Sequence, residues 1–138
     1  MDTASSKIQY LNTDLELESE NDVTAIVEAF GEDVIVLHHG MARALHHAAF
    51  EIAGSHAGPD EDIRYFCTLV EALPPEVRTV WNGCCTRVFD IGYKSGNGSP
   101  AYRSELRSGT VRAVAEIGAS IVVTVYPVGA DVSGRGDR

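Results

Sequence analysis

The stretch KIQYLNTDLEL, residues 7–17, is followed almost at once by SENDVTAIVEAFG, residues 19–31, and the two stretches differ in hydrophobic period. Apolar and polar side chains alternate through much of the first stretch, which predicts a β-strand. In the second, apolar residues from Val23 to Phe30 recur at helical spacing, with Ser19 as the expected N-cap and Gly31 as the expected stop. A strand followed by an amphipathic helix is therefore the opening unit of the fold.

The rest of the chain continues this mixture of strands and helices. The clearest helix opens at Gly58-Pro59-Asp60, and its apolar stripe runs to Leu73 before two prolines end it. Residues 76–82 suit a short helical turn, and Ser108 is the expected cap of a further helix. Strands are predicted at residues 34–39, 45–53, 87–94, 101–107 and 120–126, with a tight turn at Gly40-Met41 and a hairpin loop at 95–100.

This order of elements predicts the fold class. We expect an α+β fold with a mixed, mainly antiparallel sheet of about six strands and two to three helices packed on one face, a ferredoxin-like variant. The β-branched run at 120–126 is expected to be a buried strand. A single domain is expected over residues 7–128, between flexible ends at 1–6 and 129–138, because both ends are small and polar.

The composition bears on the compartment. The first residues lack the basic start and apolar run of a secretory leader, and no apolar stretch approaches the roughly 20 residues of a membrane span. The three cysteines, Cys67, Cys84 and Cys85, are odd in number and two are adjacent, which is a poor disulfide framework. These features predict a cytoplasmic protein with reduced thiols and no membrane contact.

The charge is distributed unevenly along the sequence. The net charge is −9, and residues 1–62 hold 13 acidic and 2 basic side chains, whereas residues 63–138 hold 7 acidic and 9 basic ones. This balance disfavours nucleic acid as a partner and favours a basic protein. Asp14, Glu16 and Glu18 alternate on one strand face, and Asp22 follows, so these four are the predicted partner-binding residues. The alternative is that the charge serves solubility alone.

A second hypothesis is a small-molecule or metal-binding domain that uses the pairs His38/His39 and His46/His47, with His39 and His46 as the candidate ligands. Adjacent strand residues point to opposite faces, so at most two of the four imidazoles share a site easily. A tight turn at Gly40-Met41 would not set histidine against histidine, so this site requires a wider loop. No acidic residue or cysteine stands at a complementary spacing.

A third hypothesis is a cysteine-dependent enzyme in which Cys84 or Cys85 acts with a histidine. The flanking sequence matches no nucleophile signature, and buried, inert cysteine is the commoner case. Residues 95–100 do not form a phosphate-binding loop, because Lys94 precedes the glycines and a strand is predicted after them. No cofactor is therefore expected, and a non-catalytic role is favoured.

The C-terminal third also carries a resemblance. Residues 88–93 read VFDIGY, Glu105-Leu106 follows, and residues 118–127 read GASIVVTVYP. This pattern is similar to small bacterial proteins of uncharacterised function that have an "FDIG" strand and an "LGA…YP" ending. The resemblance implies a bacterial origin and an α+β fold, and it implies no chemistry. The acidic balance of residues 1–62 and the lack of catalytic motifs, rather than this resemblance, lead us to expect a protein-binding module of an immunity-like or antitoxin-like kind.

Overall fold

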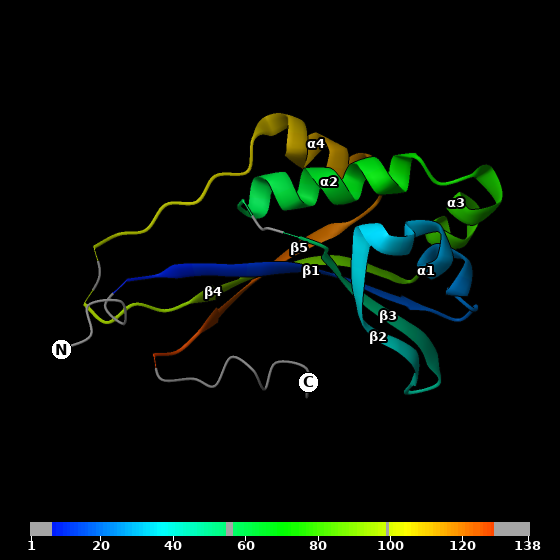
Figure 1. Cartoon of the computed structure of the whole chain (residues 1–138), viewed down its shortest axis with the longest axis horizontal. Helices are drawn as coiled ribbons and strands as arrows, with labels where there is room; N and C mark the ends of the chain where they lie inside the picture. The colour runs from blue at the N-terminus through cyan, green and yellow to red at the C-terminus, as the bar shows by residue number, and fades with distance from the viewer. Residues whose placement is uncertain (1–6, 55–56, 99, 129–138) are drawn as a thin grey trace.

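The computed structural model describes residues 7–54, 57–98 and 100–128, which form a twisted sheet with helices packed against it (Figure 1). The predicted flexible ends, 1–6 and 129–138, lie outside the described residues. No helix among the described residues has the length and apolar character needed to span a bilayer. The elements, in chain order, are β1 (Gln9–Ser19), α1 (Thr24–Phe30), a 3-10 turn (Gly31–Asp33), β2 (Val34–Ala42), β3 (Leu45–Ile52), α2 (Pro59–Glu71), α3 (Pro75–Asn82), β4 (Thr86–Lys94), α4 (Ser108–Glu116) and β5 (Ser120–Tyr126).

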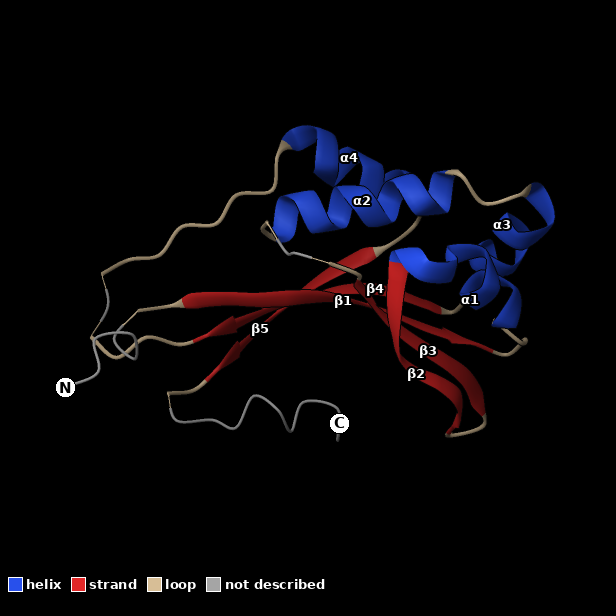
Figure 2. Cartoon of the chain, in the orientation of Figure 1, coloured by secondary structure: helices blue, strands red, loops and turns tan. Residues whose placement is uncertain are grey.

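The described strands form one sheet in the order β2-β3-β1-β4-β5. The first three neighbouring pairs are antiparallel, and β5 joins β4 in parallel after the crossover through α4. The helices α1, α2, α3 and α4 lie on the same side of the sheet (Figure 2). The α+β class and the mixed sheet are as predicted, and the described residues form five strands and four α-helices in place of about six and two to three. Up to β4, the elements follow the β-α-β-β-α-β order of ferredoxin-like motifs, with one additional helix, α3.

The strand predicted at residues 101–107 is absent, and this is the main correction to the predicted elements. A hairpin partner would need a free edge of β4, but β1 and β5 occupy both edges. Residues 101–107 instead contact β4 through side chains. The ring of Tyr102 lies edge-on to Tyr93, and the Tyr93 hydroxyl donates a 2.7 Å hydrogen bond to Ser104 Oγ.

The turn between β2 and β3 also differs from its prediction. The prediction of a tight turn at Gly40-Met41 is wrong, because both residues pair within β2 and the chain reverses at Arg43-Ala44 instead. Those two residues have φ values of 55° and 67°. Two left-handed residues in succession give the twist that a two-residue hairpin requires. Asparagine or glycine is usual at such positions, so the sequence gives no sign of this turn.

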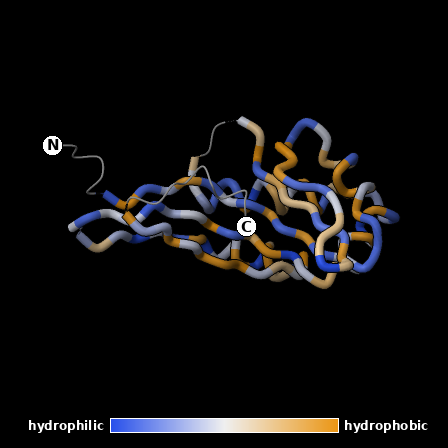
Figure 3. The backbone as a smooth tube through the Cα atoms, turned by 90° about the horizontal axis from the view of Figure 1, so that it is seen from below, coloured by the Kyte–Doolittle hydropathy of each residue, from blue (hydrophilic) through white to orange (hydrophobic). Residues whose placement is uncertain are grey.

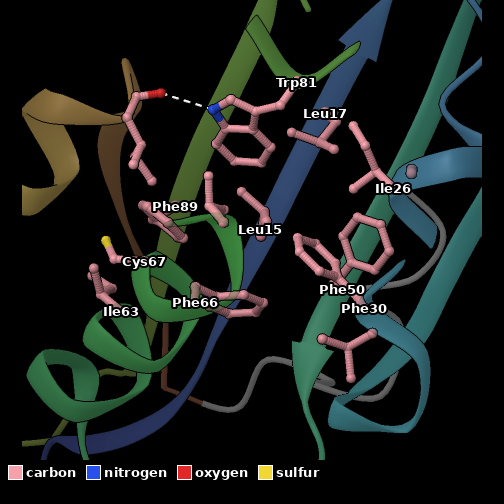
Figure 4. Close-up of a cluster of buried hydrophobic side chains, with 14 of the residues drawn as sticks. Leu15, Leu17, Ile26, Phe30, Phe50, Ile63, Phe66, Cys67, Trp81 and Phe89 are labelled. Carbon is pink, nitrogen blue, oxygen red and sulfur yellow. Dashed lines mark hydrogen bonds between the residues drawn. The ribbon is translucent and has the colours of Figure 1, made fainter. Parts of the chain in front are cut away.

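The core lies between the sheet and the helices (Figure 4). Leu15, Phe50 and Phe89 project from three neighbouring strands, and Phe66 and Ile63 of α2 pack over them. Alternate positions on each strand face the helices, as the period of two requires.

At one end of this core, Trp81 of α3 is fully buried, and its indole N–H donates a 2.8 Å hydrogen bond to the Ile117 carbonyl (Figure 4). A buried indole N–H needs such a partner. The indole thus ties the end of α3 to the segment that leaves α4.

The run at 120–126 is the predicted strand β5, but it is not buried. It forms one edge of the sheet, and the side chains of Val123 and Val125 are each 57% exposed. A strand with the apolar, β-branched sequence that is typical of a sheet interior thus lies at the edge of this sheet.

Candidate binding face

The side of the sheet opposite the helices carries a group of acidic residues. Leu15 pairs with Phe50 on β3 and with Phe89 on β4, and all three face the core. Because successive side chains on a strand point to opposite sides, their neighbours point away from the helices. We call this side the helix-free face; Figure 3 views the molecule from that direction. Its carboxylates are Asp14, Glu16 and Glu18 on β1, Glu51 on β3 and Asp90 on β4.

Three of these carboxylates form a row across neighbouring strands. Asp14 is the register partner of Glu51 on β3 and of Asp90 on β4. Residues directly opposite each other in an antiparallel pair have Cβ atoms about 5 Å apart, and like charges in such positions repel. Only 5% of Asp14 and 8% of Asp90 is exposed to solvent. The row therefore gathers acidic groups at the centre of the sheet, where little water reaches Asp14 and Asp90.

Neutral donors orient the row. Asn12 Nδ2 donates to Asp14 Oδ1 at 3.2 Å and also to Glu51 Oε2. On the other side, the Thr124 hydroxyl of β5 donates a 2.7 Å hydrogen bond to Asp90 Oδ1. These contacts fix the positions of the acidic groups.

Glu16 and Glu18 extend the acidic surface along β1 towards His47. Glu18 Oε1 accepts a 2.7 Å hydrogen bond from the Thr86 hydroxyl, and Glu18 Oε2 lies 3.0 Å from His47 Nε2. The geometry of the His47 contact does not satisfy a hydrogen bond, so its attraction is electrostatic and requires a protonated imidazole. His47 also lies edge-on to His38, with ring centroids 6.1 Å apart.

Asp22, His39 and His46, the other residues predicted to bind a partner or a metal, lie near the start of α1 rather than on the helix-free face. Asp22 precedes α1, and its Oδ1 accepts hydrogen bonds from the Thr24 amide at 2.7 Å and the Thr24 hydroxyl at 2.6 Å, which lower the pKa of its carboxyl. Asp22 rather than Ser19 therefore satisfies donors at the helix start. His39 lies near it, 3.3 Å from the Thr24 hydroxyl, and His46 also lowers the Asp22 pKa. Asp22 is thus separated from Asp14, Glu16 and Glu18.

The candidate metal ligands His39 and His46 share the helix side of the β2–β3 hairpin, because their register partners are Ala48 and Met41. Within residues 7–54, 57–98 and 100–128, no three histidine, cysteine or acidic side chains are placed to hold a metal ion. The described residues therefore offer no geometric support for the metal hypothesis.

The cysteines occupy different environments. Cys67 and Cys84 are buried, whereas Cys85 is exposed and its Sγ lies 3.4 Å from the Glu18 carbonyl. Burial raises the pKa of the Cys67 thiol to about 11 and also raises that of Cys84. A thiol with a raised pKa holds little of the thiolate that acts as nucleophile.

We expect iodoacetamide at neutral pH to alkylate Cys85 in the folded protein and to leave Cys67 and Cys84 unmodified until denaturant is added. Peptide mass spectrometry of samples quenched at successive times measures all three rates together. Modification of Cys84 in the folded state at the rate of Cys85 would contradict this assignment and revive the hypothesis of a reactive Cys84.

A shallow charged depression lies where the start of α2 meets the start of α4. Its lining carries both signs of charge, from Asp60, Glu61, Arg64, Glu105 and Arg107. Asp60 Oδ1 accepts a 2.9 Å hydrogen bond from the Arg107 amide, so it satisfies a donor at the start of α4. The charges here join the two helices and form no row of one sign.

Two members of the helix-free face, Glu51 and Asp90, were not among the predicted binding residues. Each is a polar residue flanked by apolar neighbours on a predicted strand, which indicates an outward position. The pairing of β3 and β4 with β1 is what places them beside Asp14, and single-strand patterns do not specify that pairing. Searches of family models, curated proteins and solved structures found nothing that matches this chain.

Proposed function

We propose that the protein is a non-catalytic binding module whose helix-free face docks a basic protein surface. The row Glu51–Asp14–Asp90, extended by Glu16 and Glu18, is the observation that carries the proposal. Basic side chains of a partner would meet the partly exposed carboxylates of Glu16, Glu18 and Glu51. Asn12 already holds Glu51 and Thr86 holds Glu18, which reduces the ordering cost of binding. Electrostatic complementarity of this kind speeds association and fixes the partner's orientation.

The arrangement of the sheet supports the same role. The helices cover one side, so the strands of the other side can meet a partner over a broad, gently twisted surface. The acidic residues lie on the three central strands, which are held by neighbours on both edges. A rigid, charged face of this type suits the masking of a basic protein, as expected for an immunity-like or antitoxin-like module in a bacterial cytoplasm.

The test must separate this face from the overall negative charge. We expect a fluorescent oligoarginine peptide, as the probe, to bind the wild-type protein with an affinity that falls steeply as salt rises. Neutralising Glu16 and Glu18 together, as Glu16→Gln with Glu18→Gln, is expected to weaken binding roughly fivefold, or about 1 kcal/mol. Fluorescence anisotropy at several salt concentrations measures both effects.

The matched control removes the same charge from the helix side. Glu28 on α1 and Glu32 just after it are exposed and belong to the same acidic half of the chain. The variant with Glu28→Gln and Glu32→Gln should bind the peptide as the wild-type protein does. Equal weakening in the two double variants would show that only net charge matters, and the face would lose its assigned role.

A further inference from the structure

The two edge strands of the sheet differ in how they are protected against pairing with another strand. On β2, the register shifts between Val36 and His38, so Leu37 forms a bulge in that edge. Bulges of this kind twist an edge away from partners. On β5, the register with β4 is regular from Ser120 to Tyr126, and the strand contains no charged side chain and no proline. The β5 edge therefore lacks the usual protections.

The exposed side chains of β5 are of the apolar, β-branched type that usually lies in the interior of a sheet. Val123 and Val125 face the helix side beyond the cover of α4, and Val122 faces the other side. Tyr102 adds an exposed ring beside Tyr93, the register partner of Val125. An uncharged, β-branched strand with apolar residues exposed on both faces is typical of a position covered by a neighbour.

The backbone of β5 shows which groups face outward. The Ser95 amide donates a 2.8 Å hydrogen bond to the Tyr126 carbonyl, so Tyr126 directs its backbone groups towards the β4 side. Backbone direction alternates along an extended strand, so Ile121, Val123 and Val125 direct their N–H and C=O groups away from β4. The Ala119 amide already bonds to the Val114 carbonyl, and Pro127 has no N–H. The available outward set is thus these three residues.

This set is complementary to itself when two β5 strands run antiparallel about a two-fold axis at Val123. Val123 then faces Val123 of the second copy, and Ile121 faces Val125, so each of the three outward residues finds an outward partner. A shift of the axis to a neighbouring residue leaves one of the three without such a partner. In the centred register, Val122 also faces Thr124, so no charged side chains meet.

The charge distribution favours the same contact. The net charge of −9 opposes association of two copies through most surfaces. The strands β1, β2 and β3, which belong to the acidic half, lie on the far side of β4 from the β5 edge. Pairing through β5 therefore keeps the acidic parts of the two copies apart.

We propose that two copies of this chain form a homodimer through antiparallel pairing of their β5 strands, centred on Val123. The dimer has one continuous sheet with all helices on one side. Because directly opposed residues share a face, the two helix-free faces lie side by side on the other side.

Sedimentation and light scattering test the dimer. The wild-type protein is expected to show twice the 14.8 kDa chain mass at high concentration and to dissociate on dilution. Val123→Lys places two like charges opposite each other and should give a folded species at the single-chain mass, with folding checked by circular dichroism. The control Met41→Lys alters a residue of similar exposure, 59% against 57% for Val123, on the β2 edge and should leave the dimer intact.

Disulfide trapping tests the register. In a Cys85→Ser background, Val123→Cys is expected to give a cross-linked dimer under mild oxidation, because directly opposed Cα atoms lie about 5.5 Å apart. Val125→Cys is equally exposed but lies four residues out of register with its own copy, about 13 Å away, and should not cross-link. A wild-type monomer at every concentration, a dimer insensitive to Val123→Lys, or cross-linking through position 125 instead of 123 would each overturn the proposal. A monomer is also the result expected if another protein or another segment of this chain covers the β5 edge.

Discussion

Replacing Trp81 with alanine is expected to lower the free energy of unfolding by about 4 kcal/mol. The indole is fully buried between α3 and the sheet, and its removal leaves a large cavity and an unpaired Ile117 carbonyl. Urea unfolding followed by circular dichroism gives the difference in midpoint.

Trp81→Phe is the informative comparison, because it keeps an aromatic ring in the core and loses the hydrogen bond to Ile117. We expect it to cost about 2 kcal/mol, clearly less than the alanine variant. Equal losses in the two variants would mean that the hydrogen bond, rather than core packing, gives Trp81 its importance.

Replacing Arg87 with alanine is expected to lower the free energy of unfolding by about 3 kcal/mol. Its guanidinium donates hydrogen bonds to four backbone carbonyls, those of Trp81, Asn82, Cys84 and Gly118, at 2.7 to 3.2 Å. One planar group thus donates hydrogen bonds both to carbonyl groups at the end of α3 and to the carbonyl of Gly118, just after α4. The φ of Gly118 is +73°, and a Cβ atom there would lie 3.0 Å from the guanidinium, so the site requires glycine.

Arg87→Lys keeps the charge but cannot span the same carbonyls, so we expect it to recover less than half of the lost stability. Thermal unfolding of the three proteins at matched pH measures the series. A lysine variant as stable as the wild type would contradict the view that the fork of donors, rather than the positive charge, is what stabilises this junction.

The success and failure of sequence-based prediction have a common physical origin. Periodicity within a segment is local, and it correctly predicted most of the helices and strands, including the short helix α3. The strand at 101–107 failed because its existence depends on a free edge of β4, which is a property of the whole sheet. The turn at Arg43-Ala44 failed because neither residue favours the left-handed conformation that the hairpin imposes.

The same distinction between local patterns and long-range pairing applies to the residues of the candidate site. Alternation along one strand was enough to predict that Asp14, Glu16 and Glu18 share a face. Glu51 and Asp90 joined them only through pairing between strands distant in sequence. Asp22 was grouped with the three by its proximity in the chain, but the chain turns into α1 there and the residue satisfies the helix start instead.

The most direct test of the helix-free face is a map of where a basic ligand binds. Amide chemical shifts of isotope-labelled protein, followed by NMR during titration with the oligoarginine peptide, locate the contact residue by residue. We expect the largest changes in β1, β3 and β4 around Glu16, Glu51 and Asp90. Changes centred on α1 and the start of α2, with the central strands unaffected, would contradict it.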